Sequence, residues 1–360
     1  MARKALRAIE FLEEVCFRED AFMRVMRTAE DLMTTDLKTL TLDDTVGKAL
    51  NVMKENNIRH AAVMEIPEDD QGQKGRPIFI GVISQRDLFR YVSPYWGTVA
   101  QREEDTAALS RRLSDIVARN PASAPPETPI EEILGLMTEK RIDVVPILAG
   151  AELAGLVTAG DIVKAVVIMG KLKQLQKGVT AGRKVRLMDM LGDTGTSAKP
   201  SFLLAVHTVK DVMTEQVVHL GPKDTVKKAM ETMREGKFRH VPILDEAGHV
   251  AGIVSDRDIL LHLPPPTSEQ MLKKNVEFRN RLFAVDETHP SLATPLEEVM
   301  KKKVVSIASR ATIFEAANLL RKHQIDCLPV SDDKGRFVGL LTTRDLVRWL
   351  RTAYRMTEKS

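Results

Sequence analysis

The apolar positions of this chain follow a helical spacing that recurs four times. In each case apolar residues stand at positions i, i+3 and i+7, which places them on one face of an α-helix. A short apolar segment follows each of these helices, as in Val241-Pro242-Ile243-Leu244. We therefore predict four amphipathic helices, each leading into a buried strand. The helix positions are Val46/Ala49/Met53, Ile130/Ile133/Met137, Val226/Ala229/Met233 and Ile313/Ala316/Leu320.

A second pattern follows each helix and strand: Gly, two apolar residues, Ser or Thr, two variable residues and Asp. It occupies residues 81–87, 155–161, 252–258 and 339–345. The glycine lies 35 residues after the first helix position in the first copy and 25 or 26 residues after it in the others. The extra length fits a polar loop in the first copy, at roughly residues 65–76. Each unit then reads strand, helix, strand, strand, helix, and a unit of about 55–60 residues is expected to pair because it buries little surface alone.

The four units resemble CBS domains, the family named after cystathionine β-synthase. The openings at residues 31–34 and 211–214, both Asp-apolar-Met-Thr, are also similar to the start of that domain. CBS domains pair into Bateman modules. The resemblance therefore implies a mixed α/β fold in which four CBS repeats form two pseudo-two-fold pairs in series, with an added N-terminal helix. The predicted repeats span residues 30–92, 112–168, 208–263 and 294–351.

The odd-numbered and even-numbered repeats differ at the entrance to the middle strand. The first repeat has Arg59-His60 there and the third has Arg239-His240. The equivalent positions of the second and fourth repeats are Asp143 and Asp326. Repeats one and three are thus more alike, as are repeats two and four, which indicates that a whole pair was duplicated.

Predictions are made for four of the segments that lie outside the repeats. Residues 1–29 are predicted to be helical because Leu6, Ile9, Leu12 and Cys16 share one face, and this helix packs on the first module or docks a partner. Residues 169–207 are predicted to link the modules, and their basic run is interpreted as a solvated helix and linker rather than a nucleic-acid site. Residues 264–293 are predicted to form a loop and a helix. Residues 352–360 are predicted to be a C-terminal tail.

The composition restricts the class of protein. Hydrophobic residues make up 43% of the chain and charged residues 29%, and a net charge of +3 gives no strong attraction to nucleic acid or to an anionic membrane. No apolar run approaches the ~20 residues that a membrane span needs. Cys16 and Cys327 belong to no Cys/His cluster, so neither a disulfide framework nor a metal site is indicated. We predict a cytoplasmic protein, since sparse cysteines suit a reducing compartment.

The Ser/Thr and Asp of the repeated signature stand where a strand turns into a helix. An ionised carboxylate has two acceptor oxygens, which suits the 2′ and 3′ hydroxyls of ribose, and the N–H groups of a helix start favour phosphate. The resemblance implies that this signature holds the ribose of AMP, ATP or S-adenosylmethionine. The alternative is a capping box, in which the pair only satisfies backbone donors. The candidate ribose-binding residues are Ser84, Asp87, Thr158, Asp161, Ser255, Asp258, Thr342 and Asp345.

Basic residues beside this signature are the candidates for phosphate binding. Arginine carries a fork of donors that matches phosphate oxygens. The alternatives are a surface ion pair for each arginine and a packed strand position for each histidine. The candidate phosphate-binding residues are Arg59, His60, Arg239, His240, Arg86, Arg257 and Arg344.

The charge difference between paired repeats predicts unequal half-sites. Arg59 matches Asp143, and Arg239 matches Asp326. Equivalent positions of a two-fold pair tend to face one another, and a carboxylate near a phosphate is unfavourable. We therefore predict about one tight nucleotide per module. The alternative is that arginine and aspartate pair across the cleft and touch no ligand.

No catalytic motif of the HExxH, GxSxG or GxxxxGK type is present. We therefore predict a non-catalytic regulatory protein that requires no cofactor. It is expected to bind adenine nucleotides as regulatory ligands in clefts between paired repeats. The output is expected to be a separate protein partner or self-association as a homodimer. The alternatives are a ligand-free scaffold or oligomerisation module, and a sensor of S-adenosylmethionine or of a cyclic dinucleotide.

Overall fold

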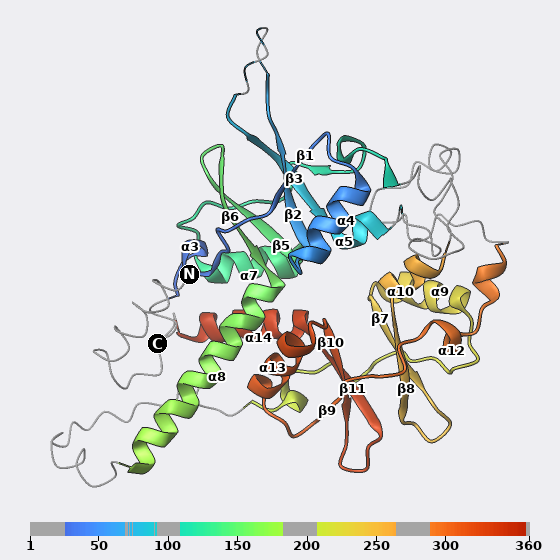
Figure 1. The fold of residues 1–360 in the computed structure, drawn as a ribbon. Coiled ribbons are helices and arrows are strands. Elements are labelled where there is room, and N and C mark those ends of the chain that lie inside the picture. The colour runs from blue at the N-terminus through green and yellow to red at the C-terminus, as the bar shows by residue number, and fades with distance from the viewer. Residues whose placement is uncertain are drawn as a thin grey trace, which may run out of the picture.

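The computed structural model describes residues 26–68, 71, 73, 75–89, 91, 109–182, 207–263 and 289–357, with only the backbone given for residues 172–182. The predicted helix at residues 1–29 lies almost entirely outside the described residues. The same holds for most of the segments predicted as linkers at 169–207 and 264–293, and for the end of the predicted tail. The described residues form four units of helix and strand, arranged as two pairs (Figure 1).

The first repeat has the predicted order of elements. It contains β1 (Thr39–Thr41), α4 (Val46–Glu55), β2 (His60–Glu65), β3 (Ile78–Ser84) and α5 (Gln85–Phe89). The strand β1 runs parallel to β2, and β2 runs antiparallel to β3. The sheet gains a fourth strand, β4 (Ala118–Arg119), from the opening segment of the second repeat.

The second repeat receives an opening segment in return. After η1 (Leu113–Asp115) and β4 it contains α7 (Ile130–Glu139), β5 (Val144–Ala149), β6 (Glu152–Thr158) and the long helix α8 (Ala159–Gly182). Thr34, which follows α3 (Ala29–Leu32), bridges Leu156 of β6. Each repeat of the first module therefore contributes backbone pairing to the sheet of the other, as expected for units that pair.

The second module repeats this arrangement. Its third repeat contains η2 (Val209–Asp211), α9 (Val226–Gly236), β7 (His240–Leu244), β8 (Val250–Ser255) and α10 (Asp256–His262). Its fourth repeat contains η4 (Pro290–Ala293), α12 (Leu296–Val299), β9 (Ile307–Ala308), α13 (Ile313–His323), β10 (Cys327–Ser331), β11 (Phe337–Thr342) and α14 (Thr343–Thr357). The opening segments cross here too, through the bridges Thr214↔Leu340 and Ile253↔Lys301.

The mixed α/β fold of four repeats is confirmed, with differences in the extent of some elements. In the second and third repeats the predicted first strand is reduced to a single parallel bridge, Ala124↔Ile147 and Leu220↔Ile243. Helix α8 also continues past residue 168 to Gly182, so the predicted inter-module linker begins as helix. Helix α14 runs to Thr357, so residues 352–357, which were predicted to belong to a tail, are helical instead. No helix within the described residues is both long enough and apolar enough to cross a membrane.

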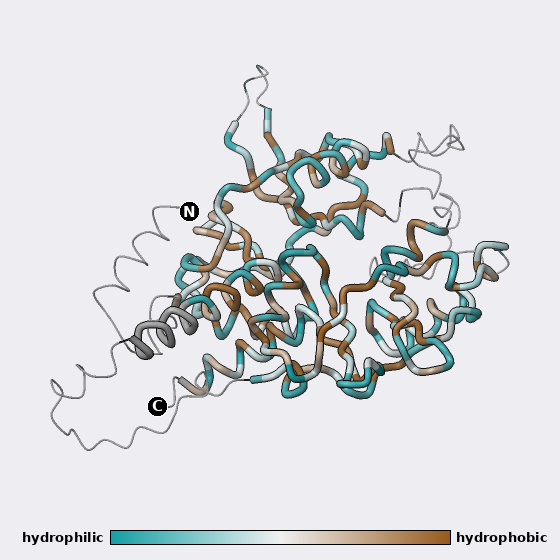
Figure 2. The backbone as a smooth tube through the Cα atoms, turned by 60° about the horizontal axis from the view of Figure 1, so that its bottom comes forward, coloured by the Kyte–Doolittle hydropathy of each residue, from teal (hydrophilic) through white to brown (hydrophobic). Residues whose placement is uncertain are grey.

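Local sequence explains where the four amphipathic helices begin and which face they bury. Thr45 and Thr225 are N-caps whose hydroxyls accept a backbone N–H of the first turn, and Thr312 forms a capping box with Glu315. The apolar positions predicted from the spacing are all at most 4% exposed. Figure 2 shows hydrophobic stretches along the strands and helices of the interior and hydrophilic residues on many outer turns.

The two modules pack together mainly through the helices of the second and fourth repeats. Helix α8 lies against α13 and α14, and α14 lies against α7 (Figure 1). Leu346 of α14, Ile133 of α7 and Val166 of α8 belong to one continuous buried core. Gly170 permits close approach of α8 and α13, because a Cβ there would lie 2.7 Å from the Cβ of Phe314.

The first and third repeats meet over a smaller surface. Helix α5 contacts α10, and Leu260 of α10 joins Leu88 in the core of the first repeat. The interface between modules therefore has an extensive apolar edge at repeats two and four. It has a thinner apolar edge at repeats one and three, and charged residues from all four repeats connect the two modules.

Candidate functional site

The hairpin of each repeat brings the two predicted motifs together. His60 pairs with Ser84 at the end of β2–β3, and His240 pairs with Ser255 at the end of β7–β8. The residue before each middle strand, at position 59, 143, 239 or 326, uses its carbonyl oxygen to accept the N–H of the first residue of the following helix, at 2.8–2.9 Å. Strand register and this hydrogen bond hold the Arg or Asp beside the signature in every repeat.

All four signatures form capping hydrogen bonds at a helix start. The backbone N–H of Ser84, Thr158, Ser255 and Thr342 donates to Oδ2 of the aspartate three residues later, at 2.7–3.0 Å. The hydroxyl of each Ser or Thr donates to the same oxygen. The capping box named as the alternative is complete in the odd repeats, where the N–H of Asp87 and of Asp258 donates back to the serine hydroxyl at 3.3 Å, and its carboxylate half is present in the even repeats. Ribose binding stays a prediction, and it depends on the second carboxylate oxygen, Oδ1.

Cations from the same helix contact Oδ1 in the even repeats. The Nζ of Lys164 lies 3.0 Å from Oδ1 of Asp161, and Arg348 forms an ion pair with Oδ1 of Asp345. Asp161 and Asp345 are only 4% and 2% exposed. A ribose diol must therefore share or displace these partners to reach the carboxylate.

The crossed opening segments add a second set of contacts. The hydroxyl of Thr34 donates to Oδ1 of Asp161 at 3.0 Å, and the Nζ of Lys301 lies 3.2 Å from Oδ1 of Asp258. Thr34 and Lys301 occupy equivalent places opposite β6 and β8, and Ala118 occupies this place opposite β3. Neither Thr34 nor Lys301 was predicted as a site residue. The Asp-apolar-Met-Thr opening at residues 31–34 was an available signal for Thr34, whereas Lys301 ends the different sequence Glu298-Val299-Met300-Lys301, which carries no such motif.

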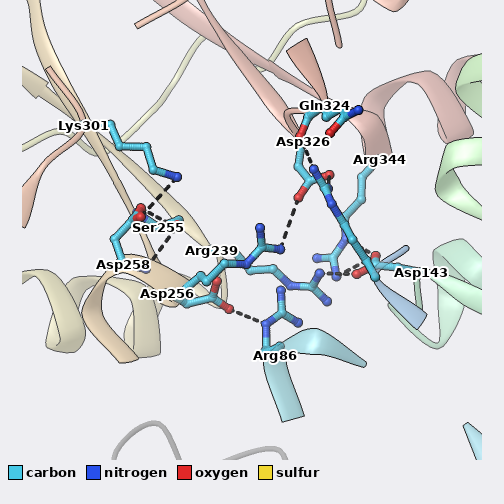
Figure 3. Close-up of polar contacts among 12 residues, drawn as sticks. Arg86, Asp143, Arg239, Ser255, Asp256, Asp258, Lys301, Gln324, Asp326 and Arg344 are labelled. Atoms are coloured by element: carbon cyan, nitrogen blue, oxygen red, sulfur yellow. Dashed lines mark hydrogen bonds and ion pairs between the residues drawn. The ribbon is translucent and has the colours of Figure 1, made fainter. Parts of the chain in front are cut away.

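The arginines of the odd repeats form ion pairs with aspartates of the opposite module (Figure 3). Arg59 of the first repeat pairs with Asp326 of the fourth and also donates to the carbonyl of Gln324. Arg239 of the third repeat pairs with Asp143 of the second. The expectation that arginine and aspartate oppose each other within one module is therefore corrected. The pairs run diagonally between modules, because the modules pack repeat one on three and repeat two on four.

The arginines of the signature point to the same place. Arg86 places Nε 2.7 Å from Oδ2 of Asp256, and Arg344 places Nε 3.4 Å from Oδ1 of Asp143. Arg257 lies 3.9 Å from Asp326. Five candidate arginines and three aspartates thus gather where the modules meet, and we call this set the central cluster. Its members are Arg59, Arg86, Arg239, Arg257, Arg344, Asp143, Asp256 and Asp326.

The central cluster carries unbalanced charge. Five guanidinium groups and three carboxylates leave a formal excess of two positive charges. Burial by itself would raise the pKa of Asp143, but Arg239 and Arg344 beside it lower that pKa well below its ordinary value. Asp326 behaves in the same way beside Arg59. Both aspartates are therefore ionised at neutral pH, and the excess positive charge persists.

His60 and His240 lie close to charged residues of the central cluster. Loss of solvation lowers the pKa of both histidines, although nearby carboxylates oppose this change. Both are therefore neutral at pH 7, and a neutral imidazole offers one donor and one acceptor. Across the described residues, no three His, Cys, Asp or Glu side chains are grouped so as to hold a metal ion.

Comparison with known proteins identifies the same four repeats that the structure shows. The family model for the CBS domain matches residues 29–94, 113–168, 209–265 and 296–352. The protein MJ1225 of Methanocaldococcus jannaschii is 27% identical over 146 residues, which are 40% of this chain and 49% of that protein, so the alignment spans about half of that relative. A 33.4 kDa protein encoded in a ribosomal RNA operon of Thermofilum pendens is 24% identical over 302 residues, 83% of this chain and 82% of that protein.

One solved structure shares the fold over most of this chain. The crystal structure of MJ1225, a protein proposed to be an archaeal homolog of g-AMPK, has a TM-score of 0.56 at 19% identity and covers 90% of this chain and 99% of that one. At this identity the likeness concerns the fold alone. A structure of CBSX2 in complex with AMP is 24% identical, covers 41% of this chain and 97% of its own, and has a TM-score of 0.31.

Proposed function

Because this chain belongs to the CBS domain family, we propose that it is a regulatory protein that binds adenine nucleotides between its repeats. The ribose is held by the signature aspartates, and the phosphates extend toward the central cluster. The chain acts by binding and catalyses no reaction itself. Its output is a separate protein partner or a second copy of the chain.

The convergence of five arginines on three aspartates is the observation that carries this proposal. The signature arginines Arg86, Arg257 and Arg344 each stand one residue before a signature aspartate. A single ligand can therefore meet a carboxylate with its sugar and a guanidinium with its phosphate. Guanidinium groups bind phosphate with two parallel hydrogen bonds, which makes them well suited to this task.

The charge of the central cluster distinguishes between adenosyl ligands. An excess of two positive charges attracts a nucleotide phosphate and disfavours the sulfonium cation of S-adenosylmethionine. AMP, ADP and ATP are therefore the favoured ligands. S-adenosylmethionine and cyclic dinucleotides remain the alternatives that a ligand screen separates.

Sensing requires that the ligand prefers one arrangement of the modules. A ligand shifts such an equilibrium only by its difference in affinity for the two arrangements. Arg59 and Arg239 connect the two modules, so a phosphate that binds them acts at the module interface. About one tight nucleotide per module, two per chain, is the stoichiometry we propose, with phosphates near Arg59/His60 and Arg239/His240.

The first test is a calorimetric and thermal-unfolding screen of AMP, ADP, ATP, S-adenosylmethionine and cyclic di-AMP. A ligand at 100 times its dissociation constant adds about 2.7 kcal/mol to the stability of the folded state, so the melting midpoint should rise by several degrees. Arg239→Ala should weaken AMP binding, and Arg336→Ala, which removes an exposed ion pair with Asp332, should not. Absence of binding by every adenine ligand would favour the scaffold alternative.

A further inference from the structure

Two aspartates hold the guanidinium groups that the proposed function assigns to ligand phosphates. Asp143 forms ion pairs with Arg239 and Arg344, and Asp326 forms them with Arg59 and Arg257. In each case the aspartate belongs to an even repeat, and Arg59 and Arg239 come from the odd repeat of the opposite module. Carboxylate and phosphate oxygens use the same donors of a guanidinium group. The aspartates and a phosphate therefore compete for one set of donors.

The pairs remain accessible to a ligand. The side chains of Arg239 and Asp143 are 26% and 21% exposed, and those of Arg59 and Asp326 are 31% and 34% exposed. A fully sequestered pair would exclude any competitor, whereas these pairs are partly in contact with solvent. The excess of arginine over aspartate also leaves donors that the three carboxylates do not neutralise.

We propose that Asp143 and Asp326 are internal competitors of the ligand phosphate, and that they set the affinity and the charge preference of the nucleotide sites. This inference rests on the proposed function. A phosphate near Arg239 must displace or share Asp143, and the two anions repel at short range. Each exchange would also replace a contact between modules by a contact with ligand, which couples occupancy to module packing.

The consequence differs for charged and uncharged ligands. Replacing either aspartate by asparagine removes a competing negative charge and raises the formal excess of the central cluster from two to three. AMP should then bind about tenfold more tightly, the lower bound for one charge-assisted hydrogen bond. Adenosine carries no phosphate, so its affinity should not change.

The experiment is a calorimetric titration of the full chain with AMP and with adenosine. The variants are Asp143→Asn and Asp326→Asn, and the control is Asp43→Asn, which removes an equal charge from an exposed ion pair with Arg112. The ratio of AMP to adenosine affinity should rise about tenfold in both central variants and stay constant in the control. An unchanged or smaller ratio in both central variants overturns the inference.

Thermal unfolding separates competition from a purely structural role. Both central variants should melt lower without ligand, because an arginine loses its counter-charge. The rise in melting temperature caused by AMP should nevertheless exceed that of the wild type. A lower melting temperature with no larger AMP-induced rise contradicts the inference. Asp326→Asn, at the more exposed of the two carboxylates, provides the measurement where Asp143→Asn does not fold.

The wild type distinguishes this inference from the proposed function. If the wild type binds neither AMP nor another adenine ligand, the proposed function fails and the inference fails with it. If the wild type binds AMP and the ratio is the same in all variants, the proposed function stands. In that case Asp143 and Asp326 only hold the modules together.

Discussion

The two edges of the module interface differ in how much apolar surface they bury. At repeats two and four, α7, α8, α13 and α14 share a continuous apolar core that includes Leu346 and Trp349. At repeats one and three, α5 and α10 meet through few apolar side chains, among them Leu260. The central cluster adds ion pairs between the modules. The edge at repeats two and four is thus stabilised by burial of apolar surface, which offers no group for a phosphate to bind. The ion pairs of the central cluster offer guanidinium groups that an anion can bind directly.

This difference indicates where a ligand signal acts. Apolar packing is short-ranged and close to the density of a crystal, so the edge at repeats two and four resists small displacements. The ion pairs of Arg59 and Arg239 are partly exposed, so an exchange of partners there would open no buried cavity. A nucleotide that binds near Arg59 or Arg239 therefore acts on the contacts most easily rearranged.

The largest expected effect comes from breaking the apolar edge. Leu346→Ala removes a fully buried side chain of α14 from the shared core, and the free energy of unfolding should fall by about 3–5 kcal/mol. Leu260→Ala at the thinner edge, where the side chain is 8% exposed, should lower it by about 2 kcal/mol. Urea unfolding measures both. Equal losses at the two positions would show that the edges are built alike.

Acidification should lower the free energy of unfolding through the two histidines beside the central cluster. The pKa values of His60 and His240 are lowered below their ordinary value of 6.5, with burial as the main cause. Between the lowered pKa and 6.5 the unfolded chain binds more protons than the folded chain. Stability is therefore complete above pH 6.5 and decreases as the pH falls below it, by at most ~1.4 kcal/mol per pH unit for each histidine.

Urea midpoints measured from about pH 7.5 to pH 5 report this slope. The double variant His60→Asn/His240→Asn should have a flatter profile in this window. His262, whose pKa burial also lowers, remains in that variant and accounts for a residual slope. A profile as steep as that of the wild type would show that the two histidines titrate as they do in the unfolded chain.

The smallest expected change in stability concerns the helix caps. Variants at these positions distinguish a capping role of the signature from a role in ligand binding. Asp87→Ala and Asp258→Ala should each lower the free energy of unfolding by about 1 kcal/mol, as loss of a cap does. Glu315→Ala breaks the exposed capping box of α13 and should cost a similar amount. Only the two aspartate variants should weaken AMP binding. Normal AMP binding in both, together with lower melting, would mean that the signature is a cap and nothing more.

Much of each repeat could be predicted from the sequence because its determinants are local. The spacing of apolar residues identified the amphipathic helix of each repeat, and the positions named for these four helices are buried. The Ser/Thr-x-x-Asp signature identified the helix starts and the capping hydrogen bonds. The signature lies beside the Arg-His pair or the Asp at the start of the middle strand because the two strands are antiparallel neighbours along the chain, including in the first repeat, where a longer loop joins them.

Other features depend on segments that are far apart in the chain. Thr34 contacts Asp161 across 127 residues because the opening segments cross between repeats. The first strand of the second and third repeats is only a single bridge, which the pattern of apolar residues does not distinguish from a full strand. Sequence spacing alone does not report which sheet an opening segment joins.

Local patterns of residues specify the four repeats, their helix starts and the charged residue at each middle strand. The partners of those charges depend instead on how the repeats pack. Arg59 and Asp326 are separated by 267 residues, and Arg239 and Asp143 by 96. Their pairing follows from how α7, α8, α13 and α14 pack the modules against each other. Burial of these apolar faces depends on the shape of two assembled surfaces, whereas the register of a hairpin depends on residues that are close in the chain. The register can therefore be predicted from a single sequence, and the packing of the modules cannot.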